Sequence, residues 1–168
     1  PAAAAGGIDE SDNGNGSLMR ILPVALRFCD AAPEVVADQA MRWSAITHRH
    51  PRSQLACAGY CLIAQQLLHG STPAVAVKTG GETLATLLSR FPAECSQFAR
   101  IFDGAFAKTG RDDIRSGGYV IETLEAAIWS LLHGGSFSDI VLRAVNLGGD
   151  TDTTGCVAAG LAGVWLGV

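Results

Sequence analysis

The sequence predicts an all-α protein, and three observations support this fold class. Apolar residues recur at three- and four-residue steps over most of the chain, as they do along one face of a helix. No segment alternates apolar and polar residues as a half-buried strand does. Prolines and glycines fall between the periodic segments, where helices commonly begin and end. We therefore expect one compact multi-helix bundle over residues 1–168, with any functional site on loops at helix ends.

The expected helices follow one another with short polar breaks. Pro23 predicts a kink or a new start in the first helix, and Gly80-Gly81 predicts an interruption in the fourth. Ser136 or Ser138 is expected to cap the seventh. A stripe of glycine and alanine in the last helix suggests that it is buried at the centre of the bundle. The expected ranges are 18–29, 33–47, 51–69, 73–91, 92–106, 120–133, 136–147 and 154–168.

Residues 1–13 are rich in alanine and glycine at their start and show no periodicity, so we expect a flexible N-terminal segment. The chain does not begin with Met, which suggests part of a longer protein. With 48% hydrophobic and 17% charged residues, it has the composition of a well-packed soluble domain.

Composition also argues against several classes of protein. A formal charge of −4 without a Lys/Arg cluster disfavours a nucleic-acid-binding surface. No apolar run reaches the length needed to cross a membrane, and no signal peptide is evident. The five cysteines are odd in number, and Cys57 and Cys61 lie one helical turn apart among apolar neighbours. This pattern is typical of reduced, buried thiols in a cytoplasmic protein.

The stretch with the clearest chemistry is Gly148-Gly149-Asp150-Thr151-Asp152-Thr153-Thr154-Gly155. If it is extended, Asp150 and Asp152 leave the backbone on the same side and converge. A hard cation such as Mg²⁺ would remove their repulsion by binding carboxylate and hydroxyl oxygens. The alternative is a helix N-cap, for which Asp and Thr are equally suited. Taken by itself, this stretch leaves both interpretations open.

Three more polar turns lie at expected helix ends: 13–17, 47–50 and 116–119. Residues 13–17 can bind a phosphate through backbone N–H groups, or can be an ordinary Asn-Gly turn with a serine cap. His48 can donate to a phosphate or ribose oxygen, or be a solvated loop histidine. Tyr119 can stack on a ring, or be a half-buried aromatic at a helix start. The pair Asp112-Asp113 is flanked by arginines and is better interpreted as a solvated charged loop.

Taken in order, these segments resemble the ADP-ribosylglycohydrolase family of all-α enzymes. The resemblance spans nearly the whole chain, and the last motif is the most specific. It is carried by Gly14-Asn15-Gly16-Ser17-Leu18-Met19-Arg20, Thr47-His48, Ser116-Gly117-Gly118-Tyr119-Val120, Glu122-Thr123-Leu124-Glu125-Ala126-Ala127 and Asn146-Leu147-Gly148-Gly149-Asp150-Thr151-Asp152-Thr153.

The resemblance implies metal-dependent hydrolysis of the N- or O-glycosidic bond that links ADP-ribose to a protein side chain or a small conjugate. It implies a site with two Mg²⁺ ions, or Mn²⁺ in their place. Three sets of residues match the family's positions: metal ligands Asp150, Asp152 and Thr153; the loop around ADP-ribose, Asn15, Gly16 and Ser17; and His48 near the phosphates with Tyr119 at the adenosine end.

The chain departs from the family pattern in one respect. Family members carry an upstream Thr/Ser-Asp-Asp-Thr motif that supplies further metal ligands, and an acidic residue that assists proton transfer. The sequence contains neither, so the catalytic residue is unknown and we expect little or no activity from this chain alone. A missing N-terminal part, or a second copy of the chain, is expected to complete the site. The alternative is a non-catalytic ADP-ribose-binding or crystallin-like structural protein with the same fold.

Overall fold

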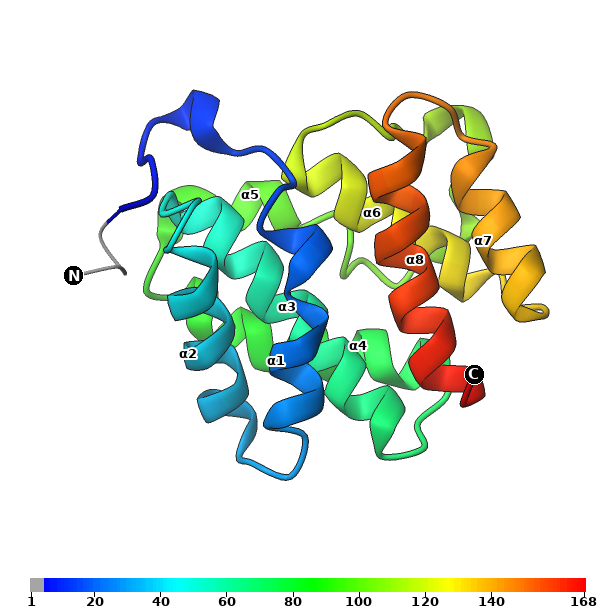
Figure 1. Ribbon diagram of the computed structural model, residues 1–168, viewed down its shortest axis with the longest axis horizontal. Coiled ribbons are helices and arrows are strands. Elements are labelled where there is room, and N and C mark those ends of the chain that lie inside the picture. The colour runs from blue at the N-terminus through cyan, green and yellow to red at the C-terminus, as the bar shows by residue number, and fades with distance from the viewer. Residues whose placement is uncertain (1–4) are drawn as a thin grey trace.

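The computed structural model describes residues 5–168, and within this range it contains eight α-helices and no strand. Figure 1 shows how these helices are arranged. The expected all-α fold is confirmed. The α-helices are α1 (Leu22–Arg27), α2 (Pro33–Ser44), α3 (Pro51–Leu68), α4 (Pro73–Leu88), α5 (Cys95–Phe98), α6 (Val120–Leu132), α7 (Phe137–Val145) and α8 (Thr151–Leu166). Short 3₁₀ turns lie between them: η2 (Glu10–Asp12), η3 (Leu18–Arg20), η4 (Pro92–Glu94), η5 (Phe106–Lys108) and η6 (Arg111–Asp113).

The central helix is α3, which packs against α1, α2, α4, α6 and α8. Fourteen of its 18 residues are buried, including its two cysteines. The last helix, α8, does not hold the central place that its small residues suggested. Asp152 and Cys156 along the helix, and Leu166 at its C-terminal end, are exposed. Its glycines still allow close approach. A Cβ at Gly155 would lie 2.9 Å from Val145 Cγ2 of α7, and one at Gly160 would overlap the Tyr60 hydroxyl of α3.

Prolines begin the first four helices, as the sequence predicted. Pro23, Pro33, Pro51 and Pro73 each lie at the first or second helical position, where the missing N–H would have no partner anyway. Of the two expectations for Pro23, the new helical start is confirmed, because η3 ends at Arg20 and α1 follows it.

The interruption predicted at Gly80-Gly81 is wrong, because α4 runs through both glycines. Their role is close packing. A Cβ at Gly80 would lie 3.1 Å from the backbone nitrogen of Ile63 in α3, and one at Gly81 would lie 2.8 Å from Cγ of Phe102. The helix predicted over 92–106 is also wrong: this segment folds as η4, the single turn of α5 and a series of turns leading to η5.

Part of the N-terminal segment expected to be flexible makes specific contacts. Residues 1–4 lie outside the described range. Further on, the Gly6 N–H donates to the Ala45 carbonyl at 3.2 Å, and the Arg49 N–H donates to the Gly7 carbonyl at 2.9 Å. Asn13 is buried, and its side-chain oxygen accepts from Ser53 at 2.9 Å. These bonds hold the segment beside the loop that carries His48.

The buried, reduced thiols predicted at Cys57 and Cys61 are confirmed as free and fully buried, whereas Cys95 and Cys156 are exposed. Burial raises the pKa of both buried thiols, which keeps them protonated and unreactive. None of the helices between residues 5 and 168 combines the length and apolarity needed to cross a membrane.

Candidate functional site

Three of the four polar turns meet around residues 116–118, the segment before α6, which we call the central loop. The Asp150 N–H donates to the Ser116 carbonyl at 2.8 Å, and the Asn15 N–H donates to the Gly118 carbonyl at 3.0 Å. The fold therefore brings together residues that are more than a hundred positions apart in the chain.

A two-glycine turn places the start of α8 against the central loop. Gly148 and Gly149 have φ values of +88° and +64°, in the left-handed region that favours glycine. A Cβ at Gly149 would lie 2.5 Å from the Ser116 carbonyl oxygen, so no larger residue fits there without displacement. The Ser116 hydroxyl donates to the Gly148 carbonyl at 2.8 Å and closes the turn.

Asp150 occupies the N-cap position of α8, but its side chain makes no capping hydrogen bond. Its Oδ2 instead accepts from the amide nitrogen of Asn15 at 2.8 Å. The same amide donates to the Thr123 hydroxyl of α6 at 2.8 Å, which fixes which way the amide faces. The bond from Asn15 is the main reason why the pKa of Asp150 is lowered, with the nearby Thr153 hydroxyl and Asp152 adding to it. Asp150 is therefore an ionised carboxylate at neutral pH.

The extended conformation expected around Asp150 and Asp152 is wrong, because α8 begins at Thr151, three residues earlier than predicted. In a helix, residues three apart share a face, so Asp150 is followed on its face by Thr153. Thr153 is buried, with its hydroxyl 4.0 Å from Met19 Sδ, and Asp152 is exposed in the same first turn.

The donor set at this helix end suits a hard cation. Asp150, Asp152 and Thr153 offer carboxylate and hydroxyl oxygens, which Mg²⁺ and Mn²⁺ prefer. No group of three or more His, Cys, Asp or Glu residues gathers to hold a metal within residues 5–168. The three side chains thus fit one part of a coordination sphere, and the metal-binding role assigned to them stays a prediction.

His48 lies against residues 13–17, which we call the glycine-rich turn. Its Nδ1 lies 2.8 Å from the Thr47 hydroxyl, and a Cβ at Gly16 would lie 2.9 Å from its Cε1. Burial, followed by the charge of Arg20, lowers the pKa of His48, so the ring is neutral at pH 7. A neutral ring can offer one N–H donor and one acceptor to a ligand beside this turn.

Ser17 is directed differently from the other residues of its turn. It is completely buried, and its hydroxyl accepts from Ser44 at 2.9 Å and from the Cys57 thiol at 3.4 Å. The structure therefore places Ser17 in the core behind the turn, while Asn15 and Gly16 lie beside Asp150 and His48.

Tyr119 lies next to the central loop with its ring half-buried, as one of the two interpretations expected. Its hydroxyl accepts from Arg52 at 3.1 Å and donates to Gln97 at 3.0 Å. Its backbone forms an isolated antiparallel bridge with Gly14. Arg52 and Thr123 also contact these site residues, although neither was among the site residues predicted from the sequence. Arg52 resembles any charged residue of a first helical turn, and Thr123 is one small side chain in an apolar helix. The sequence pattern around each residue therefore gives no sign of a role in the site.

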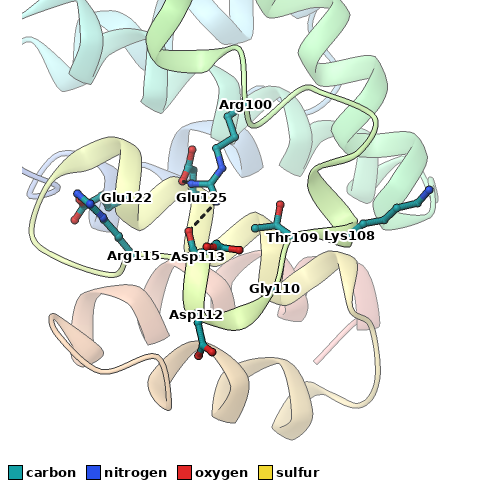
Figure 2. Close-up of a pocket in the computed structure, with 9 residues that line it drawn as sticks. All are labelled: Arg100, Lys108, Thr109, Gly110, Asp112, Asp113, Arg115, Glu122 and Glu125. Atoms are coloured by element: carbon teal, nitrogen blue, oxygen red, sulfur yellow. Dashed lines mark hydrogen bonds and ion pairs between the residues drawn. The ribbon is translucent and has the colours of Figure 1, made fainter.

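A polar cavity of about 740 Å³ lies near the central loop, with Arg115 and Glu122 among its lining residues (Figure 2). Two of its four carboxylates have partners: Glu125 pairs with Arg100 at 3.0 Å, and Glu122 accepts from the Gly117 N–H at 3.2 Å. In Figure 2 Asp112 points away from the other labelled residues, and it is exposed, in agreement with the solvated charged loop predicted there.

The chain is similar to known proteins over nearly all of its length. The sequence pattern of the ADP-ribosylglycohydrolase family matches residues 1–168. A curated relative, ADP-ribosylarginine hydrolase Tri1 of Pseudomonas putida, is 35% identical, and the match covers 97% of this chain and 41% of that protein. ADP-ribosyl-[dinitrogen reductase] glycohydrolase of Rhodospirillum rubrum is 31% identical over 95% of this chain and 48% of that protein.

The fold is shared with a solved structure described as an ADP-ribosylglycohydrolase-related protein complex. The TM-score is 0.70 with 28% sequence identity, and the match covers 94% of this chain and 52% of that one. The chain thus spans less than half the length of the two curated relatives and about half of the solved chain.

Proposed function

Because the chain belongs to the ADP-ribosylglycohydrolase family, we propose that it provides metal-binding and ADP-ribose-binding loops for the hydrolysis of a glycosidic bond. The bond is the N- or O-glycosidic link between ADP-ribose and a protein side chain or small conjugate. The observation that carries the proposal is the ionised Asp150, held by Asn15 and placed beside Asp152 and Thr153 at the start of α8.

Each group of residues has a role in this proposal. Asp150, Asp152 and Thr153 hold a Mg²⁺ or Mn²⁺ ion. Such an ion, when bound, lowers the pKa of a water molecule and stabilises negative charge during hydrolysis. Neutral His48 and the turn that contains Gly16 contact the phosphates.

The adenosine end of ADP-ribose lies against the Tyr119 ring. Arginine-linked ADP-ribose is the first substrate to test, because Tri1 of P. putida is named as an ADP-ribosylarginine hydrolase. Free, buried Cys57 and Cys61 support a reducing compartment such as the cytoplasm.

Residues 1–168 by themselves are proposed to have little or no activity. One helix end that offers two carboxylates and a hydroxyl does not hold two ions in a defined geometry. The remaining ligands come from another segment or another chain. Rapid turnover by the 168-residue chain alone would contradict this part of the proposal.

The test is hydrolysis of ADP-ribosylated arginine, serine and nucleic-acid ends in the presence of Mg²⁺, with this chain and with the entire product of its gene. We expect Asp152→Ala to reduce the rate of hydrolysis by the entire gene product by at least about tenfold. The reason is that the loss of a metal ligand weakens metal binding at least as much as the loss of a residue that hydrogen-bonds to a ligand. Asp38→Ala is the matched control, since Asp38 is an exposed acid on α2 that pairs only with Arg42. In the entire gene product, an unchanged rate in Asp152→Ala, or no turnover of any of these substrates, refutes the proposal.

A non-catalytic ADP-ribose-binding protein is the second candidate. It is favoured by the finding that no larger metal-binding group gathers within the described residues. It predicts that ADP-ribose binds with the same affinity to the unaltered chain and to Asp152→Ala, and that the entire gene product shows no turnover.

A further inference from the structure

Arg52 is a buried cation whose position at the start of α3 does not require a charge. It is 7% exposed, and its Nε donates to Glu94 Oε2 at 2.7 Å while its Nη2 lies 3.4 Å from Glu94 Oε1. Glu94 is also buried, so this forked pair is largely removed from water. Burying both charges costs free energy that two apolar side chains of the same volume would not cost. The pair is therefore poorly explained by stability alone.

The remaining nitrogen of Arg52 reaches the candidate site. Its Nη1 donates to the Tyr119 hydroxyl at 3.1 Å and to Glu10 Oε1 at 3.1 Å. The Tyr119 hydroxyl in turn donates to Gln97 at 3.0 Å, so both its acceptor and its donor capacity are used. The guanidinium carbon also lies 6.0 Å from the centre of the Tyr119 ring.

Tyr119 is consequently held at both ends. Its backbone is bridged to Gly14 of the glycine-rich turn, and its hydroxyl is fixed by Arg52 and Gln97. The ring between these two attachments is half-buried and keeps an accessible part. Fixing an aromatic ring in this way avoids the loss of rotamer freedom that would otherwise oppose ligand binding.

We propose that Arg52 is a positioning residue that holds the Tyr119 ring in place for the adenosine part of ADP-ribose. This inference rests on the proposed function, because it takes ADP-ribose as the ligand. Arg52 acts through Tyr119 and does not touch the reacting bond. Its removal therefore weakens binding of ADP-ribose more than it slows the hydrolytic step.

The experiment measures the dissociation constant of ADP-ribose by calorimetry for the unaltered chain, Arg52→Met, Tyr119→Phe and the double variant. We expect Arg52→Met to weaken binding about 3- to 10-fold, the effect of freeing one ordered side chain. The double variant is expected to bind no more weakly than the weaker single variant, because both changes remove the same hydrogen bond. Arg42→Met is the matched control, since Arg42 is exposed on α2, and its affinity is expected to match the unaltered chain.

Turnover by the entire gene product supplies a second measurement, in which Arg52→Met raises KM by a larger factor than it lowers kcat. If circular dichroism shows that Arg52→Met does not fold, Gln97→Ala takes its place. Gln97 is partly exposed, and its replacement removes the other hydrogen bond of the Tyr119 hydroxyl, so this variant is expected to weaken ADP-ribose binding about 2- to 5-fold.

Unchanged affinity in a folded Arg52→Met or Gln97→Ala variant overturns the inference, as do fully additive effects in the double variant or a loss confined to kcat. Failure of the unaltered chain to bind ADP-ribose overturns the proposed function together with this inference. The two failures are thus told apart by the unaltered chain.

Discussion

Gly160 of α8 faces Tyr60 of the central helix at close range, and Gly160→Ala tests that packing directly. A Cβ there would overlap the Tyr60 hydroxyl oxygen and lie 3.1 Å from Leu22 Cδ2. Tyr60 is buried, and its hydroxyl donates to the Val157 carbonyl at 3.1 Å, so moving the ring would disturb the core and break this hydrogen bond. The added methyl group must either displace Tyr60 or push α8 away from α3.

The magnitude follows from three contributions to the free energy of unfolding. Overpacking of a close-packed core costs about 1–3 kcal/mol. Loss of the hydrogen bond from Tyr60 to Val157 costs about 1 kcal/mol. Alanine is better than glycine in a helix by about 1 kcal/mol, which offsets part of the loss. We therefore expect Gly160→Ala to lower the free energy of unfolding by about 1–3 kcal/mol.

Urea unfolding followed by circular dichroism measures this change in Gly160→Ala, Tyr60→Phe and the double variant. Because Tyr60→Phe removes the overlapping oxygen, the cost of the alanine is expected to fall by at least about 1 kcal/mol in that background. Gly104→Ala is the control, since a Cβ at Gly104 meets nothing within 4 Å, and its effect is expected to stay within about 0.5 kcal/mol. If Gly160→Ala is as stable as the unaltered chain, or if the effects of the two substitutions are strictly additive, Gly160 is not packed against the Tyr60 hydroxyl as the structure has it.

Two further predictions concern single side chains. Ser136→Ala removes the hydroxyl that accepts from the Asp139 N–H at 3.2 Å, and it is expected to destabilise the protein by about 1 kcal/mol in urea unfolding. Ser138 is the second residue of α7, and Ser138→Ala is expected to have little effect. Burial raises the pKa of Glu125 against the opposing charge of Arg100, so folding takes up a proton at this carboxyl. The stability of the unaltered chain relative to Glu125→Gln is therefore expected to rise as the pH falls from about 7 to about 4, through the raised folded-state pKa towards the unfolded one.

Each of these predictions has a clear contrary result. Equal losses in Ser136→Ala and Ser138→Ala would mean that the cap of α7 does not depend on the Ser136 hydroxyl. Of the two serines suggested by the sequence, the structure selects Ser136, which forms a reciprocal capping box with Asp139. A constant difference between the unaltered chain and Glu125→Gln across the pH range would mean that burial does not perturb this carboxyl.

Helix starts were predictable where they depend on local backbone chemistry. A proline at the first turn of a helix loses no hydrogen bond, so Pro33, Pro51 and Pro73 locate their helices without knowledge of the fold. Gly80-Gly81 was misjudged for the opposite reason. Two adjacent glycines weaken an isolated helix. Here they lie against Ile63 and Phe102, and this close packing keeps α4 helical through both glycines.

The candidate site shows the same division. The residues of the Asp150 loop and of the glycine-rich turn carry chemistry that is visible in sequence, because carboxylates, hydroxyls and glycines in such short runs are unusual in a helix. What each side chain faces was not visible. Ser17 and Asn15 belong to the same turn, yet Ser17 points into the core towards Ser44, whereas Asn15 points towards Asp150.

The all-α class, most helix starts and the positions of the polar turns along the chain were predictable from the sequence. These features depend on periodicity and on backbone preferences, which act over a few residues. The central place of α3, the hydrogen bond from Asn15 to Asp150 and the one from Arg52 to Tyr119 became known only from the packing of the helices. Those contacts join residues 67 and 135 positions apart, and no local preference specifies which distant group will satisfy a buried donor or charge.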